Sequence, residues 1–129
     1  MSPDPVQPSL PLLTVPGPPL HLPSLTDDER DAAMADLTVW VDTFMDRFAV
    51  EVRSIPPCWI RHNGMVEALA ALRDHERGSY ADDAPPGAAV DFLRAWREAE
   101  ATLTGMTALT QCTGVEHRDP PRRHTLARP

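Results

Sequence analysis

The stretch PPCWIRHNGM, Pro56–Met65, lies between two segments of helical apolar period and holds one of the chain's two cysteines. Its two prolines are expected to end a helix before them, because proline lacks a backbone N–H and pushes the preceding residue out of the α region. Asn63 is a good N-cap residue for a new helix. The stretch is therefore predicted to connect two helices, and it places Cys58 and His62 in that connection.

The segment before the prolines predicts a long amphipathic helix. It opens with TDDE, a capping-box pattern in which Thr26 accepts a backbone N–H and Glu29 reaches back to the cap. The three acids also suit the positive end of the helix dipole. Apolar residues then recur at three- and four-residue steps, which places them on one face. They are Leu37, Trp40, Val41, Phe44, Phe48 and Val52.

Two more amphipathic helices are predicted after the connection. The second runs from Asn63 to about Gly78, with the glycine as a left-handed C-terminal residue. The third runs from about Pro86 past Leu103 and is expected to stop at Gly105; the MTALTQC segment beyond is too short to assign by period. The predicted buried positions are Met65, Val66, Leu69, Ala70 and Leu72 on the second helix, and Ala89, Phe92, Leu93, Trp96 and Leu103 on the third.

Three amphipathic helices with short connections predict an all-α fold, a three-helix antiparallel bundle. No segment alternates at period two for long enough to predict a strand. Residues 1–23 include eight prolines, so they are predicted to form a disordered arm of polyproline II character. The helical domain is predicted to span residues 24–117, and residues 118–129 are predicted to form a disordered basic tail.

Composition argues against several classes of function. The net charge of −7 gives the helical part an acidic character, which disfavours a broad nucleic-acid-binding face. No run approaches the roughly 18 apolar residues that a membrane span needs, and prolines interrupt the apolar residues near the N-terminus. These features predict a cytoplasmic protein without a membrane partner. Two cysteines in such a chain suggest reduced thiols or a metal site more than a structural disulfide.

The bundle topology predicts where the cysteines and histidines meet. In an up-down-up arrangement, the link between the first two helices lies at the same end as the segment after the third. Cys58 and His62 occupy the first place, and Cys112 and His117 occupy the second. Two thiolates and two imidazoles form a complete ligand set for a tetrahedral structural zinc ion. The four residues are therefore the predicted metal ligands.

Other interpretations of these residues stay open. Both cysteines could be small buried apolar residues or a disulfide pair, and His124 or His75 could replace the fourth ligand. The sequence Asp74–His75–Glu76 does not predict a triad, because consecutive helical positions do not face each other; a solvated charged face is the expected structure. Motifs for a serine hydrolase, a zinc protease, a P-loop and a dinucleotide site are all missing from the sequence. No catalytic or cofactor-binding residue is assigned, and the protein is predicted not to be an enzyme.

Two segments also carry a family resemblance, LTVWVDTFMDRFAVEV…PPCWIRHNGMVEALAALRDHER and FLRAWREAEATLTGM…C. They resemble a family of small helical actinobacterial proteins, a domain of unknown function, with a Trp-rich helix, a Cys-Trp-x-x-His turn, two further helices and a late cysteine. Such proteins are often encoded on plasmids, integrative elements and phages. The resemblance implies that genomic setting and no activity. It covers about Leu37 to Cys112, and the matching positions are Cys58, Trp59, His62, Leu69, Trp96 and Cys112.

The sequence therefore favours a non-enzymatic accessory or interaction protein of an actinobacterial mobile element, with zinc stabilising one end as a hypothesis. Its partner is expected to be another protein. A homodimer is plausible, because Trp40, Phe44 and Phe48 offer more apolar surface than a small bundle can cover. The alternative is a small nucleic-acid-binding regulator that uses the second or third helix together with the arginine tail.

Overall fold

In a computed structural model, the structure of the chain is described for residues 18–112 and 116–118. Within these ranges the regular structure is entirely helical, which confirms the predicted all-α fold with three helices. None of the helices in this part of the chain has the length and apolar character needed to cross a membrane. The elements are the short 3-10 turns η1 (Leu22–Ser24) and η2 (Trp59–Arg61) and the helices α2 (Asp27–Phe48), α3 (Asn63–Ser79) and α4 (Ala88–Thr110).

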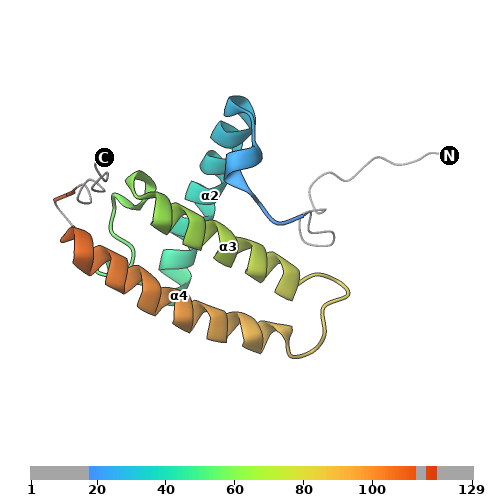
Figure 1. The fold of residues 1–129 in the computed structure, drawn as a ribbon. Coiled ribbons are helices and arrows are strands. Elements are labelled where there is room, and N and C mark those ends of the chain that lie inside the picture. Colours follow the sequence, from blue (N-terminus) through green and yellow to red (C-terminus); the bar gives the residue numbers. More distant parts are fainter. Residues whose placement is uncertain (1–17, 113–115, 119–129) are drawn as a thin grey trace, which may run out of the picture.

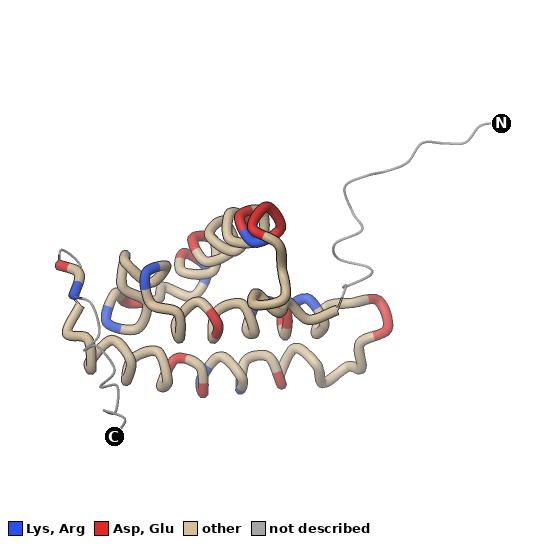
Figure 2. The backbone as a smooth tube through the Cα atoms, turned by 45° about the horizontal axis from the view of Figure 1, so that its top comes forward, with Lys and Arg blue, Asp and Glu red and all other residues tan. Residues whose placement is uncertain are grey.

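The helices α3 and α4 form an antiparallel hairpin (Figure 1). The helix α2 lies on one side of this hairpin and crosses it at a steep angle, as both Figure 1 and Figure 2 show. Of the predicted antiparallel bundle, α3 and α4 pack in the antiparallel way. The helix α2 covers one of their faces obliquely. The hydrophobic core lies where the three helices meet.

Aromatic rings fill the centre of the core. The Phe44 side chain is fully buried, and its ring centroid lies 4.4 Å from that of Phe48 and 4.8 Å from that of Trp96. The contact with Trp96 is edge-to-face, a favourable geometry for aromatic pairs. Trp40 also stacks on Phe44, at 4.8 Å. The aromatic side chains of α2 that suggested a dimer are therefore largely packed within one chain.

Both ends of α2 are set by local hydrogen bonds. The predicted capping box is present: the Thr26 N–H donates to Glu29 at 2.9 Å, and the Glu29 N–H donates to the Thr26 hydroxyl at 3.2 Å. At the other end Ala49 turns left-handed, with φ of 51°, so the helix ends well before the prolines. The prediction that Val52 belongs to the apolar face is wrong, because this residue lies beyond the helix and its side chain is 46% exposed.

The boundaries of α3 and α4 also differ from prediction. His62 is the N-cap of α3, and Asn63 is its first residue. Gly78 lies inside the helix without a positive φ. Gly105 does not stop α4, which continues until Gln111 turns left-handed. All five predicted buried positions on α3 are confirmed, whereas Leu93 on α4 is 46% exposed and does not belong to the inner face.

The N-terminal limit of the folded part lies earlier than predicted. Leu22 was assigned to the disordered arm, but its side chain is buried in the core. The backbone N–H of Leu20 donates to the Asp74 carboxylate at 2.6 Å, which fixes this segment against α3. Residues 20–23 therefore belong to the helical domain. The rest of the predicted arm, residues 1–17, and residues 119–129 of the predicted tail lie outside the described residues.

A polar seam joins α2 to α3 and replaces the predicted solvated charged face. The Glu76 carboxylate accepts hydrogen bonds from the Trp40 indole at 2.9 Å and from the Arg47 guanidinium at 2.8 Å. The Glu76 side chain is only 14% exposed. Arg73 on α3 forms ion pairs with Asp36 on α2 and with Asp74. Asp74 and Glu76 therefore take part in contacts within the fold, whereas His75 stays exposed, and the Asp36 and Arg47 side chains remain 56% and 45% exposed.

We expect the substitution Phe44→Ala to lower the free energy of unfolding by about 3–5 kcal/mol, because it removes a large buried ring and leaves a cavity among four aromatic neighbours. The matched control is Val39→Ala on the same helix, where the side chain is 66% exposed. This substitution should change the free energy of unfolding by only about 0.5 kcal/mol. Chemical denaturation followed by circular dichroism measures both. Equal costs for the two variants would contradict the described core.

Candidate metal centre

A single turn of 3-10 helix holds the first pair of candidate ligands. The carbonyl of Cys58 accepts a hydrogen bond from the Arg61 N–H at 2.8 Å, and the His62 N–H donates to the Trp59 carbonyl at 3.0 Å. This winding brings positions 58 and 62 to the same side of the turn, so that Cys58 Sγ and His62 Nε2 lie 3.6 Å apart. The buried Trp59 ring anchors the turn in the core.

The end of α4 supplies the second pair. Gln111 leaves the helix with φ of 60°, and the next residue, Cys112, is buried against the start of α3. Its sulfur lies 3.4 Å from His62 Nε2. Further along the chain, His117 comes back to the same place, with Nδ1 3.8 Å from Cys112 Sγ. The hairpin thus joins two pairs that are about fifty residues apart in the sequence, as the bundle topology predicted.

The four side chains form one group, the Cys–His cluster, which consists of Cys58, His62, Cys112 and His117. Its two sulfurs and two ring nitrogens all lie within 4.8 Å of one another. A tetrahedral zinc ion with bonds of about 2.3 Å to sulfur and about 2.0–2.1 Å to nitrogen separates its ligand atoms by about 3.3–3.8 Å. The separations of 3.4, 3.6 and 3.8 Å in the cluster match that range. The cluster could therefore hold a metal ion.

The two thiols of the cluster have different electrostatic environments. Burial raises the pKa of Cys58, and its interaction with Cys112 raises it further. Burial also disfavours the charged form of Cys112. Hydrogen bonds, first among them those from Thr110 and from the Arg118 backbone, outweigh this effect and lower the pKa of Cys112 to about 6. Cys112 is thus the thiol more readily ionised, and the thiolate is the form that binds metals.

The backbone of Arg118 holds the returning chain against the end of α4. Its N–H donates to Cys112 Sγ at 3.2 Å, which stabilises the thiolate, and its carbonyl accepts from the thiol form at 3.3 Å. The Arg118 side chain donates to the Gln111 side-chain oxygen at 3.3 Å. The rings of His62 and His117 lie beside each other, with centroids 4.9 Å apart. The segment that carries the fourth candidate ligand is therefore attached to the helical domain at several points.

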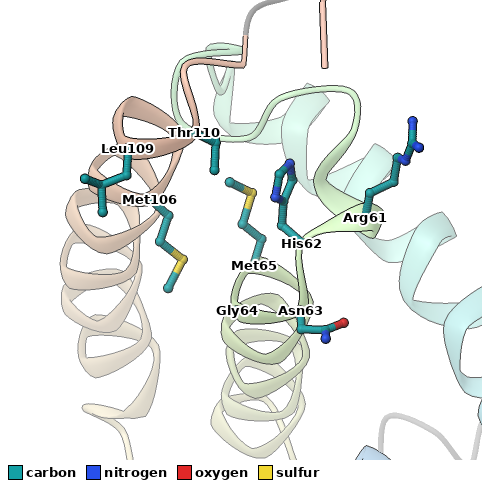
Figure 3. Close-up of a pocket in the computed structure, with 8 residues that line it drawn as sticks. All are labelled: Arg61, His62, Asn63, Gly64, Met65, Met106, Leu109 and Thr110. Carbon is teal, nitrogen blue, oxygen red and sulfur yellow. The ribbon is translucent and has the colours of Figure 1, made fainter. Parts of the chain in front are cut away.

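An apolar groove opens beside the cluster, between the first turn of α3 and the last turns of α4 (Figure 3). Its volume is about 510 Å³, and His62 is one of the residues that line it. Figure 3 shows the side chains of Met65 and Met106 between the two helices, with Leu109 on the outer side of α4. The sequence pattern did not reveal this groove, because it depends on the contact between two helices.

The structure also bears on the alternatives for these residues. Both cysteines are free thiols. His75, the alternative fourth ligand on α3, is not part of the cluster, since its ring lies beside Ser79 and Phe92. His124 lies outside the described residues. Sequence reasoning missed the support that Thr110 and the backbone of Arg118 give to Cys112, and no sequence motif marks such backbone contacts.

Comparison of the chain with protein-family models, with curated proteins and with solved structures finds no match. The resemblance to a family of small actinobacterial proteins therefore stays a prediction.

We expect the two thiols of the metal-free protein to ionise in separate steps. The pKa of Cys112 should lie well below the ordinary thiol value, because hydrogen bonds to its thiolate outweigh burial, and the pKa of Cys58 should lie above it, because burial and the neighbouring Cys112 outweigh its own hydrogen bond and the nearby Arg61. Thiolate absorbance in the ultraviolet, followed against pH, measures both steps. The protein unfolded in denaturant is the control and should show a single step. A single step at the ordinary value in the folded protein would contradict the asymmetry.

Proposed function

We propose that the Cys–His cluster is a structural zinc site that fastens the C-terminal segment to the α3–α4 hairpin. The observation that carries this proposal is the meeting of two sulfurs and two imidazole nitrogens within 4.8 Å. These atoms come from two segments about fifty residues apart in the sequence, which the antiparallel packing of α3 against α4 brings together. Two thiolates and two imidazoles are a ligand set that favours zinc over calcium or magnesium, which prefer oxygen.

The number of ligands supports a structural role. Catalytic zinc keeps one coordination position for water or substrate, whereas four protein ligands fill a tetrahedral shell. The cluster supplies four, and two of them, His62 and Cys112, are buried. A site of this kind has no position at which a substrate could bind the metal. A filled coordination shell fits the proposal that the protein is not an enzyme.

The energetic consequence of such a site is local. Zinc binding contributes to folding free energy when the ligands are gathered only in the folded state. Here the last residue of α4 is Thr110, and Cys112 follows after a single left-handed residue. Among the described contacts of Cys112 and Arg118 are weak hydrogen bonds to the Cys112 sulfur and one bond from Arg118 to the Gln111 side chain, and a metal bond would be far stronger than any of these. Zinc would make this end of the hairpin a rigid platform.

A zinc-stabilised helical domain with no catalytic position fits an accessory or interaction protein. The setting on an actinobacterial mobile element and the cytoplasmic location remain part of this proposal, from the family resemblance and from composition. Support for the nucleic-acid-binding alternative is weak: Arg73 on α3 is engaged in ion pairs, and the exposed Arg94 and Arg97 on α4 share that helix with the exposed Asp91 and Glu98. Acidic residues also predominate along α2 (Figure 2). Binding of duplex DNA at low salt would revive that alternative.

We expect the protein, purified without a histidine tag, to carry one zinc ion per chain in native mass spectrometry. Chelation should remove the ion and lower the melting temperature, because the metal then no longer links the two segments that carry its ligands. The variant Cys112→Ala should retain no zinc. Cobalt substitution should give the absorption of a tetrahedral site with two thiolate ligands, which distinguishes the cluster from adventitious surface binding.

The matched control for this experiment is His75→Ala, which removes an imidazole from α3 outside the cluster. This variant should keep one zinc ion and the same cobalt spectrum. Two results would overturn the proposal: a metal-free protein that takes up no zinc when the ion is added, or a Cys112→Ala variant that binds zinc as tightly as the parent chain.

A further inference from the structure

One face of the α3–α4 hairpin is covered by no other element among residues 18–112 and 116–118. α2 packs on a different side of the hairpin (Figure 1). The groove beside the cluster is followed on this face by a second hollow of about 290 Å³, between the middle parts of α3 and α4. Positions 64, 68, 71 and 75 of α3 recur at helical spacing, so that both hollows lie on one face.

Small side chains make this face unusually accessible to another helix. The second hollow is lined by Ala68 and Ala71 from α3 and by Ala95 and Ala99 from α4. Helices can approach more closely where the residues at the contact are small. At the cluster end, the Leu109 side chain is 80% exposed at the edge of the groove. The face thus combines an apolar channel with a protruding apolar side chain.

The two ends of the hairpin carry opposite charge. Arg61 and Arg118 are exposed at the cluster end, with Glu116 beside them. At the other end, the loop between α3 and α4 exposes Asp82 and Asp83. Figure 2 shows this acidic loop at the end opposite to the cluster. A surface with an apolar centre and opposite charges at its ends is complementary to a reversed copy of itself.

We propose that this face binds a second copy of the chain, so that two α3–α4 hairpins pack as four antiparallel helices. A two-fold axis that lies in the interface plane, perpendicular to the helix axes, reverses one copy relative to the other, and the same patch then serves on both subunits. The basic end of each copy meets the acidic loop of its partner at two equivalent places. Leu109 of each copy then lies against the far end of the partner's hairpin, where the helical spacing of the same face continues to the small residues Gly78 and Ala88.

The charge pattern also selects this face over the other exposed apolar patch. That patch consists of Phe48, Val90 and Leu93, and it is flanked by Arg94 and Arg97. A two-fold axis through it would bring the arginines of the two copies together, and like charges in contact disfavour association. On the hairpin face, the two Glu98 side chains beside the second hollow form one like-charge pair near the axis, against two sets of opposite charges at the ends. The inference is drawn from the apolar face and the charged ends of the hairpin and not from the proposed zinc ion, although the cluster residue His62 also lines the groove.

The first test is the mass of the full-length protein by sedimentation velocity at low salt and high micromolar concentration. We expect a species of twice 14.2 kDa. The variant Leu109→Glu should sediment as the monomer, because it places two buried charges in the interface while the exposed position leaves the fold of each chain intact. The matched control Val39→Glu makes the same kind of change on α2, at a side chain that is 66% exposed, and should remain dimeric.

A monomeric parent chain under these conditions would overturn the proposal, and so would a dimer that survives Leu109→Glu. Circular dichroism and zinc content are recorded for every variant, so that a loss of fold or of metal is distinguished from a loss of the interface. A dimer that depends on Val39 instead would place the interface on α2, which also contradicts the proposal.

A charge exchange tests the predicted orientation. One variant carries Asp82→Arg and Asp83→Arg, and the other carries Arg61→Asp and Arg118→Asp. Each variant alone should be monomeric, because its two ends then carry like charge at both contacts. An equimolar mixture should form a heterodimer, because each reversed end finds its opposite on the other chain. A mixture that stays monomeric, or single variants that dimerise as well as the parent, would refute the antiparallel arrangement.

Discussion

The antiparallel packing of α3 against α4 is the constraint on which the rest of this molecule depends. It returns the end of α4 to the start of α3, and this return alone brings Cys112 within 3.4 Å of His62. The packing is close at the same end: a Cβ atom at Gly64 would lie 3.3 Å from Met106 Cε. An alanine at position 64 would require the end of the Met106 side chain to shift by a few tenths of an ångström, close to where the cluster is formed. The candidate metal centre is therefore a product of helix packing before it is a product of ligand chemistry.

The helix α2 fixes the other side of the same hairpin by two kinds of contact. Phe44 places apolar area against Trp96 on α4, while Glu76 on α3 receives the indole of Trp40 and the guanidinium of Arg47. The aromatic contact buries apolar surface. The polar contacts fix the direction in which α2 crosses, because the largely buried Glu76 carboxylate must keep its hydrogen-bond partners. The steep crossing leaves the face around Ala68 and Ala99 uncovered, which is why that face remains available for another chain.

Local signals in the sequence predicted what depends on local physics. The period of apolar residues placed all three helices, and the capping box at Thr26 marked the start of α2 correctly. The helix ends were predicted wrongly because Ala49 and Gln111 take left-handed conformations that usually favour glycine, and only tertiary packing can impose them on other residues. The role of Glu76 was missed because its partners Trp40 and Arg47 lie on another helix, so only tertiary packing brings them together. The cluster residues were found because topology restricts which chain ends can meet, whereas the contacts from Thr110 and Arg118 have no sequence signature.

The metal centre and the proposed interface meet at one end of the hairpin, and this has a thermodynamic consequence. His62 belongs to the cluster and also lines the groove, and Arg118, which the interface uses, is held by its backbone to Cys112. A metal that orders this end removes conformational freedom that association would otherwise have to remove, so zinc binding should favour the dimer. Linkage makes the effect reciprocal: the dimer must then bind zinc more tightly than the monomer, by the same factor. Metal binding and dimerisation would thus be coupled. The apolar groove alone contributes a small association free energy, and the metal adds to it by ordering this end of the hairpin before association.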